Sequence, residues 1–150
     1  MSLPLPDNRP RKPDSTRPAN VSAISPGARL LIVDDEPTIR AAIRRFFTRR
    51  GWQVDDAADG ALALEKILAV GYDVIISDIR LPALSGIELH DRLVELRPAL
   101  LDRLILATGD TGDAPAAELA KRARCPILQK PFELGALAKL VEAVRQASAA

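Results

Sequence analysis

Four short apolar runs, each followed by a polar residue, constrain the fold of this chain more than any other feature. The clearest run, Tyr72–Asp78, contains three consecutive β-branched residues, which is typical of a strand buried on both faces of a parallel sheet. The other runs end at Asp34-Asp35, at Thr108 and at Lys130. Because the carboxyl ends of parallel strands open on one crevice, we expect these polar residues to meet at one edge of a sheet.

Helical patterns separate the apolar runs, so strand and helix alternate along the chain. Pro37 suits the first turn of the first helix, and Gly51 suits its end. Five strands alternating with five helices over about 120 residues predict an α/β domain with a doubly wound parallel sheet. The predicted helices cover 37–50, 61–70, 85–96, 114–123 and 133–147.

Local residue types predict further details of these helices. Ser85 and Glu88 have the spacing of a capping box at the start of the third helix. In the second helix, Leu68 is expected to face the core together with Leu64 and Ile67. The first helix carries an arginine-rich face that would be solvated or would bind a partner: Arg40, Arg44, Arg45, Arg49 and Arg50.

Residues 1–26 differ in composition from the rest of the chain. They hold six of the 12 prolines, among Ser, Asn, Asp and Arg, with few residues that could form a core. Such a segment is typical of a disordered Pro-rich tail or linker. We therefore expect the folded domain to cover 27–150.

Composition excludes several classes of function. A net charge of +1 gives no general basic field for direct nucleic-acid binding. No apolar run approaches the roughly 18 residues that span a bilayer, so we expect no membrane segment and a cytoplasmic protein. The single cysteine, Cys125, excludes an internal disulfide. His90 has no partner motif and is expected to be exposed.

The polar residues at the strand ends suggest a specific chemistry. Asp34, Asp35 and Asp78 would repel one another unless a cation lay between them, and carboxylate oxygens favour Mg²⁺. Lys130 would add a positive charge and Thr108 a hydroxyl for the oxygens of a phosphoryl group. Asp78, alone on the central strand, is then the candidate nucleophile. The alternatives are a helix cap for the aspartate pair and a turn residue for Thr108.

Together these segments resemble the receiver domain of two-component response regulators. The resemblance covers about residues 28–148. It includes the separations of the polar residues: 43 from Asp35 to Asp78, 30 on to Thr108 and 22 on to Lys130. The segments that carry it are LIVDDEP at 31–37, SDIRLP at 77–82 with Gly86, ATG at 107–109 and KPF at 130–132.

The resemblance implies roles for these residues. Asp78 would take a phosphoryl group from the phosphohistidine of a histidine kinase or phosphotransfer protein, or from a small phosphodonor. Mg²⁺ would be held by Asp34, Asp35, Asp78 and the backbone carbonyl of Arg80. Thr108 and Lys130 would bind the phosphoryl oxygens. The protein would catalyse its own phosphorylation and dephosphorylation, with no independent substrate turnover expected.

The family also implies features of the fold. The sheet order would be 2-1-3-4-5 in a flavodoxin-like three-layer sandwich, and the Lys130–Pro131 peptide would be cis. Gly86 would have a structural role in the loop after Asp78. Thr108 would move inward on phosphorylation, and the fourth and fifth helices could form a homodimer face.

This chain departs from the family pattern at the switch position. Ile127 stands where many receivers have Tyr or Phe, so the usual aromatic switch is replaced and we expect a smaller change there. Arg80 and Asp110 flank the pocket. They would either pair across its mouth or remain two solvated charges.

Several functions stay open on these residues. The chain would be a stand-alone regulator, a phosphorelay intermediate or the receiver portion of a hybrid histidine kinase. A receiver-like module that binds partners without phosphorylation is the alternative that Ile127 favours. An aspartate-nucleophile phosphohydrolase would need a second Asp two residues after the nucleophile, where this chain has Arg80.

Overall fold

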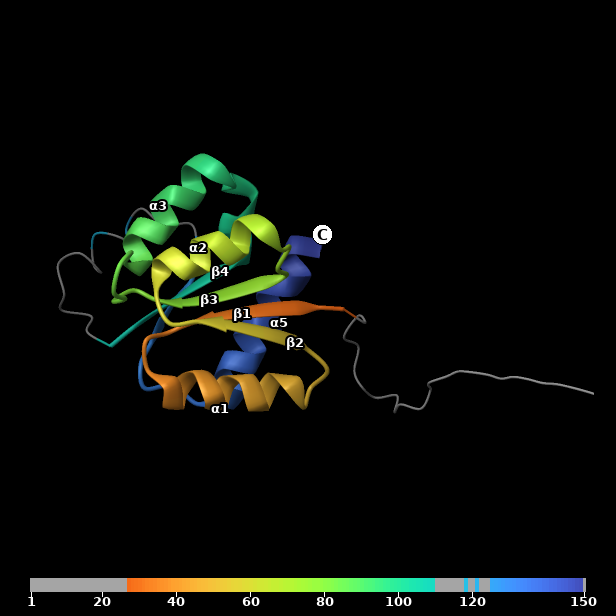
Figure 1. Ribbon diagram of the computed structural model, residues 1–150. Coiled ribbons are helices and arrows are strands. Elements are labelled where there is room, and N and C mark those ends of the chain that lie inside the picture. The colour runs from red at the N-terminus through yellow and green to blue at the C-terminus, as the bar shows by residue number, and fades with distance from the viewer. Residues whose placement is uncertain (1–26, 110–117, 119–120, 122–124, 150) are drawn as a thin grey trace, which may run out of the picture.

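The computed structural model (Figure 1) describes residues 27–109, 118, 121 and 125–149 of the chain. Within these residues, parallel strands form one sheet in the order β2-β1-β3-β4-β5. The predicted doubly wound sheet and its order 2-1-3-4-5 are therefore confirmed. The strands are β1 (Arg29–Val33), β2 (Gln53–Ala57), β3 (Val74–Asp78), β4 (Leu104–Thr108) and β5 (Ile127–Gln129).

Helices cover both faces of the sheet and make the three layers seen in Figure 1. They are α1 (Pro37–Thr48), α2 (Gly60–Ala69), α3 (Gly86–Leu96) and α5 (Leu134–Ala149). A 3₁₀ helix that the sequence did not predict, η2 (Pro98–Arg103), connects α3 to β4. Most of the helix predicted at 114–123 lies outside the described residues, as do the tail at 1–26 and Asp110.

The two faces of the sheet bury separate apolar clusters. Successive residues of a strand point to opposite faces, so Leu31 joins the cluster beneath α2 and α3, while Ile32 joins the cluster beneath α1 and α5. Phe47 of α1 and Leu137 of α5 complete the second cluster. Because both faces are covered, the strand ends are the part of the sheet that remains accessible for chemistry.

Side-chain caps fix the starts of α2 and α3. The predicted capping box is present at α3, where the Ser85 Oγ accepts the Glu88 N–H at 3.1 Å and the Glu88 carboxylate accepts the Ser85 N–H at 3.0 Å. The Asp59 carboxylate caps α2 by accepting the Leu62 N–H at 2.7 Å. These caps satisfy backbone donors that a helix start leaves unpaired.

Two predicted orientations are wrong. Leu68 is 41% exposed, because Ala63 and Ile67 occupy the core face of α2 and Leu68 lies about 100° around the helix from Ile67. His90 is buried at 3% exposure, with its Nδ1 3.0 Å from the Asp91 carboxylate. Helical periodicity gives the direction of a buried face, but the width of that face depends on the tertiary contacts of the helix.

None of the helices among the described residues has the length and apolar character that a membrane crossing requires.

Candidate functional site

Strand register brings the predicted polar residues to one edge of the sheet. Val33 of β1 pairs with Ser77 of β3, so the next residues along these strands, Asp34 and Asp78, are neighbours. Asp78 in turn pairs with Ala107 of β4, one residue before Thr108. Parallel strands keep this register along their length, and the carboxyl ends of β1, β3 and β4 therefore form one row.

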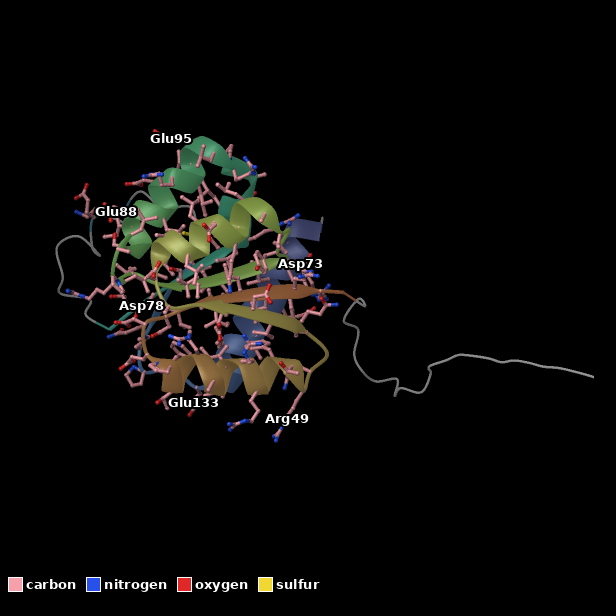
Figure 2. The ribbon with its side chains drawn as sticks, viewed as in Figure 1. Arg49, Asp73, Asp78, Glu88, Glu95 and Glu133 are labelled. Carbon is pink, nitrogen blue, oxygen red and sulfur yellow. The ribbon has the colours of Figure 1, made fainter. Side chains whose placement is uncertain are left out.

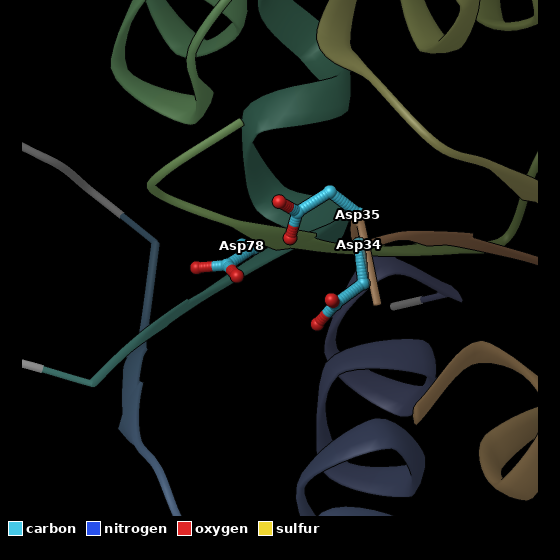
Figure 3. Close-up of side chains that lie close together, drawn as sticks. All are labelled: Asp34, Asp35 and Asp78. Atoms are coloured by element: carbon cyan, nitrogen blue, oxygen red, sulfur yellow. The ribbon is translucent and has the colours of Figure 1, made fainter. Parts of the chain in front are cut away.

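Three carboxylates meet at this edge, as Figure 3 shows. Asp34 and Asp35 follow β1, and Asp78 ends β3. One ligand oxygen from each lies within 4.8 Å of the others. Asp34 and Asp78 are buried, at 4% and 9% exposure, whereas Asp35 is exposed. The cluster is thus anchored in the protein on one side and open to solvent on the other.

Lys130 places a cation against this cluster. Its Nζ lies 2.8 Å from Asp34 Oδ2 and 3.0 Å from Asp78 Oδ2. Its backbone N–H donates to the Thr108 carbonyl oxygen at 2.8 Å. The predicted lysine is therefore held by the end of β4 and bridges the two buried aspartates.

Burial and charge act together on the ionisation of this site. Burial raises the pKa of Asp78 above its ordinary value; Lys130 partly offsets this effect, and the Asp34 carboxylate adds to it. Burial alone would lower the pKa of Lys130, but its hydrogen bonds to Asp34 and Asp78 outweigh burial and raise that pKa. The folded state therefore carries an unfavourable carboxylate charge that a bound cation would relieve.

The backbone around Asp78 is closely packed. The Arg80 N–H donates to Asp78 Oδ1 at 3.3 Å, and the Gly86 N–H donates to the Ile79 carbonyl at 2.7 Å. A Cβ built on Gly86 would lie 2.3 Å from the Asp78 carbonyl oxygen, far inside a normal contact. Gly86 therefore lets the start of α3 approach the candidate nucleophile.

The remaining predicted residues lie around this edge. Thr108 is buried at 3% exposure, and Ile127 is half-buried against the cluster beneath α2 and α3. The Lys130–Pro131 peptide is cis, as predicted. Arg80 is exposed. Its predicted partner Asp110 lies outside the described residues.

Residues 30–142 match the response regulator receiver domain family. The match spans most of the chain and nearly all of the sheet and helices described above. This chain belongs to that family.

Individual relatives of this receiver domain include both sensors and regulators. The sensor protein EvgS of Escherichia coli is 36% identical over 111 residues, which are 72% of this chain and 9% of EvgS. The transcriptional regulatory protein KdpE of Mycobacterium tuberculosis is 37% identical over 122 residues, which are 81% of this chain and 53% of KdpE. The chain therefore spans about half or less of the length of these relatives.

A solved structure supports the fold. The response regulator protein TrrA of Thermotoga maritima, solved in complex with Mg²⁺-BeF, is 30% identical to this chain. The superposition has a TM-score of 0.67 and covers 78% of this chain and 98% of TrrA.

The acidic cluster of this receiver domain fits a divalent cation. Its donors are hard carboxylate oxygens, the ligands that Mg²⁺ prefers. One oxygen from each of Asp34, Asp35 and Asp78 lies within 4.8 Å of the others, so the three carboxylates could together hold a single cation after moving closer to one another. A cation would compete with Lys130 for oxygens of Asp34 and Asp78.

Sequence reasoning missed one side chain at this site. Arg40 was expected on the exposed arginine face of α1, but its side chain is 19% exposed and its Nη1 donates to the Asp34 carbonyl oxygen at 2.7 Å. Because the acceptor is a backbone atom, no pair of residue types in the sequence marks this contact.

A hollow of about 530 Å³ borders the receiver site on the side of α1. Lys130 is one of its lining residues, and most of its lining is apolar. The lining comes from α1 and the residue before it, from the residue after β4, and from the segment after β5 up to the first residue of α5: Glu36, Ile39, Ala42, Ile43, Gly109, Lys130, Pro131, Phe132 and Leu134.

Proposed function

We propose that this receiver domain accepts a phosphoryl group on Asp78 from a phosphohistidine, with Mg²⁺ held at the acidic cluster, and signals through protein–protein contacts. The observation that carries the proposal is the position of Asp78: buried at a strand end, beside two further carboxylates and within hydrogen-bond distance of Lys130. A carboxylate in such a row is suited to nucleophilic attack on phosphorus.

In the proposed reaction an oxygen of Asp78 bonds to phosphorus while the bond from phosphorus to the imidazole nitrogen of the donor breaks. The electron pair of that bond returns to the imidazole. Mg²⁺, held by Asp34, Asp35, Asp78 and the Arg80 carbonyl, would offset charge on the transferred phosphoryl group. The Arg80 N–H, which donates to Asp78 Oδ1 at 3.3 Å, would orient the carboxylate.

Lys130 and Thr108 would hold the transferred group. The Lys130 ammonium already contacts Asp78 at 3.0 Å, so a short movement would bring it to a phosphoryl oxygen on the same residue. Thr108 is linked to Lys130 through its carbonyl oxygen, and its hydroxyl would bind another oxygen. An inward movement of Thr108 would then carry the signal, with Ile127 changing less than an aromatic residue would.

The phosphodonor would be a histidine kinase or a phosphotransfer protein. The largely apolar hollow beside α1 is lined in part by Lys130, which contacts Asp78. An apolar helix face of a donor would fit there beside the phosphoacceptor. The relatives include both a sensor and a transcriptional regulator, so stand-alone, relay and hybrid-kinase contexts remain compatible with the proposal. Residues 27–150 would form the receiver and 1–26 a disordered tail or linker, and the fourth and fifth helices would form a homodimer face.

The proposal is tested by intact-mass measurement after incubation with acetyl phosphate and Mg²⁺. We expect a gain of one phosphoryl group that chelator prevents and that Asp78→Asn abolishes. Asp73→Asn is the matched control, because it removes an aspartate from the opposite end of the sheet and should leave the gain intact. No gain in the wild-type protein, with a histidine kinase also supplied, would favour a module that acts without phosphorylation.

A further inference from the structure

We propose that Arg40 is a positioning residue of the acidic site, which holds the backbone of Asp34 and thereby fixes its carboxylate for a divalent cation. This inference rests on the proposed function, because it concerns the same Mg²⁺ site. It starts from the Arg40 guanidinium, whose Nη1 lies 2.7 Å from the Asp34 carbonyl oxygen.

Asp34 is held at each of its polar groups. Its N–H donates to the Ala57 carbonyl at 3.1 Å, and its Oδ1 accepts the Glu36 N–H at 2.9 Å. Its Oδ2 accepts from Lys130. A cation entering the site would take the place of Lys130 at Oδ2, while the other contacts can remain. The Arg40 contact is therefore one of those that would fix Asp34 in the loaded site.

Arg40 is itself held in place by β2. Its Nε lies 3.9 Å from Asp56 Oδ2, and its side chain is 19% exposed. A charged guanidinium donating to a carbonyl in such a partly buried position makes a stronger hydrogen bond than a neutral donor. Partners in the second layer around a metal ligand commonly set both its orientation and the metal affinity.

Arg44, one turn later on α1, contacts the same aspartate but not the site. Its Nη2 lies 3.1 Å from Asp56 Oδ2, and its Nη1 donates to the Val54 carbonyl at 2.7 Å. The Val54 carbonyl lies on the outer edge of β2, because the neighbouring residues of that strand bond to β1. Arg44 thus covers an edge strand. Its removal takes the same positive charge away from Asp56 without removing a contact to Asp34.

The experiment compares Arg40→Met with Arg44→Met. Both variants lose one positive charge near Asp56. If only the overall charge mattered, the loss of a positively charged side chain would tighten Mg²⁺ binding in both variants. If Arg40 positions Asp34, its loss should weaken binding by about tenfold. The Mg²⁺ dissociation constant is measured by calorimetric titration, and hydrogen exchange of the Glu36 amide is measured in metal-free buffer.

We expect Arg40→Met to weaken Mg²⁺ binding and to accelerate exchange of the Glu36 amide, which reports the Asp34 carboxylate. Arg44→Met should leave both within about twofold of the wild-type values, and Arg40→Lys, which keeps a charged donor, should recover part of the affinity. Equal or tighter Mg²⁺ binding by Arg40→Met would overturn the proposal, and so would equal weakening by Arg44→Met.

The amide measurement separates this inference from the proposed function. If the wild-type protein bound no Mg²⁺, the metal part of the proposed function would fail. Exchange of the Glu36 amide in metal-free buffer would then decide whether Arg40 fixes Asp34. An unchanged exchange rate in Arg40→Met would contradict the positioning role.

Discussion

Aspartates lie at both ends of the sheet, but they differ in how well their negative charge is balanced by nearby groups. At the carboxyl end, the described residues bring three carboxylates together beside the ammonium group of Lys130. At the amino end, the Asp73 carboxylate accepts the Arg29 N–H at 2.8 Å. In the middle of β2, away from the carboxyl end, the Asp55 carboxylate accepts the Tyr72 hydroxyl at 2.7 Å and lies 3.9 Å from Arg29 Nη1. Figure 2 shows Asp78 and Asp73 at these opposite ends.

The two ends also differ in which residues adopt a left-handed backbone conformation. Gly27 and Gly51, which have φ values of +89° and +97°, stand before β1 and β2. These are conformations that glycine adopts without strain. In the loop after Asp78, by contrast, Ala83 has a φ of +67°, where a Cβ is unfavourable. The carboxyl end therefore holds unbalanced charge and a strained loop, which is the expected signature of a site selected for function over stability.

The largest predicted effect concerns the close packing behind Asp78. Gly86→Ala would push a Cβ into the Asp78 backbone, and we expect it to lower the free energy of unfolding by about 3 kcal/mol. Gly135→Ala in α5, where a Cβ would meet nothing within 4 Å, is the control and should be neutral or stabilising. Urea unfolding measures both. Equal stability of the two variants would show that the start of α3 tolerates the extra atom.

Neutralising one aspartate at each end should change stability in opposite directions. Asp78→Asn removes a buried charge from the unbalanced cluster, and we expect the free energy of unfolding in Mg²⁺-free buffer at neutral pH to rise by about 1.5 kcal/mol. Asp73→Asn weakens a charge-assisted hydrogen bond and should lower it by about 0.5 kcal/mol. A change of the same sign in both variants would remove the distinction between the ends.

The pH dependence of the Asp78→Asn effect follows from the raised pKa of Asp78. A group with a raised pKa in the folded state favours folding while it is protonated and loses that contribution as the pH rises through its folded-state pKa. The advantage of Asp78→Asn should therefore shrink as the pH is lowered, because wild-type Asp78 then becomes neutral as well. Mg²⁺ should reduce the same advantage by stabilising the wild-type protein.

Small effects are also predicted for the strained loop. Ala83→Gly should raise the free energy of unfolding by about 0.5 kcal/mol, because relief of the left-handed strain slightly exceeds the extra chain entropy of glycine. Gly51→Ala introduces the same strain before β2 and should lower it by about 1 kcal/mol. Urea unfolding measures both variants. A lower free energy of unfolding for Ala83→Gly than for Gly51→Ala would contradict the expected strain at Ala83.

Local patterns in the sequence predicted the row of functional residues. The ends of the apolar runs gave the positions of Asp34, Asp78, Thr108 and Lys130, because a run stops where the sheet stops and parallel strands share one carboxyl edge. The capping box at Ser85 was predictable because it is a local contact between residues three positions apart in the sequence.

Contacts that depend on tertiary register could not be predicted from those patterns. The bridge made by Lys130 joins residues 96 and 52 positions away. The Arg40 contact ends on a backbone oxygen, and the burial of His90 depends on how much of α3 its neighbours cover. The resemblance to the receiver family supplied the strand order, which composition and periodicity do not determine.

The most direct test of the comparison is an NMR titration with Mg²⁺ at neutral pH, following the backbone amides at both ends of the sheet. We expect saturable shifts of the amides of Asp34, Asp35, Asp78 and Arg80, with that of Asp73 unchanged. Absence of saturable shifts at the carboxyl end, or equal shifts at both ends, would contradict the claim that the unbalanced acidic cluster is a divalent-cation site.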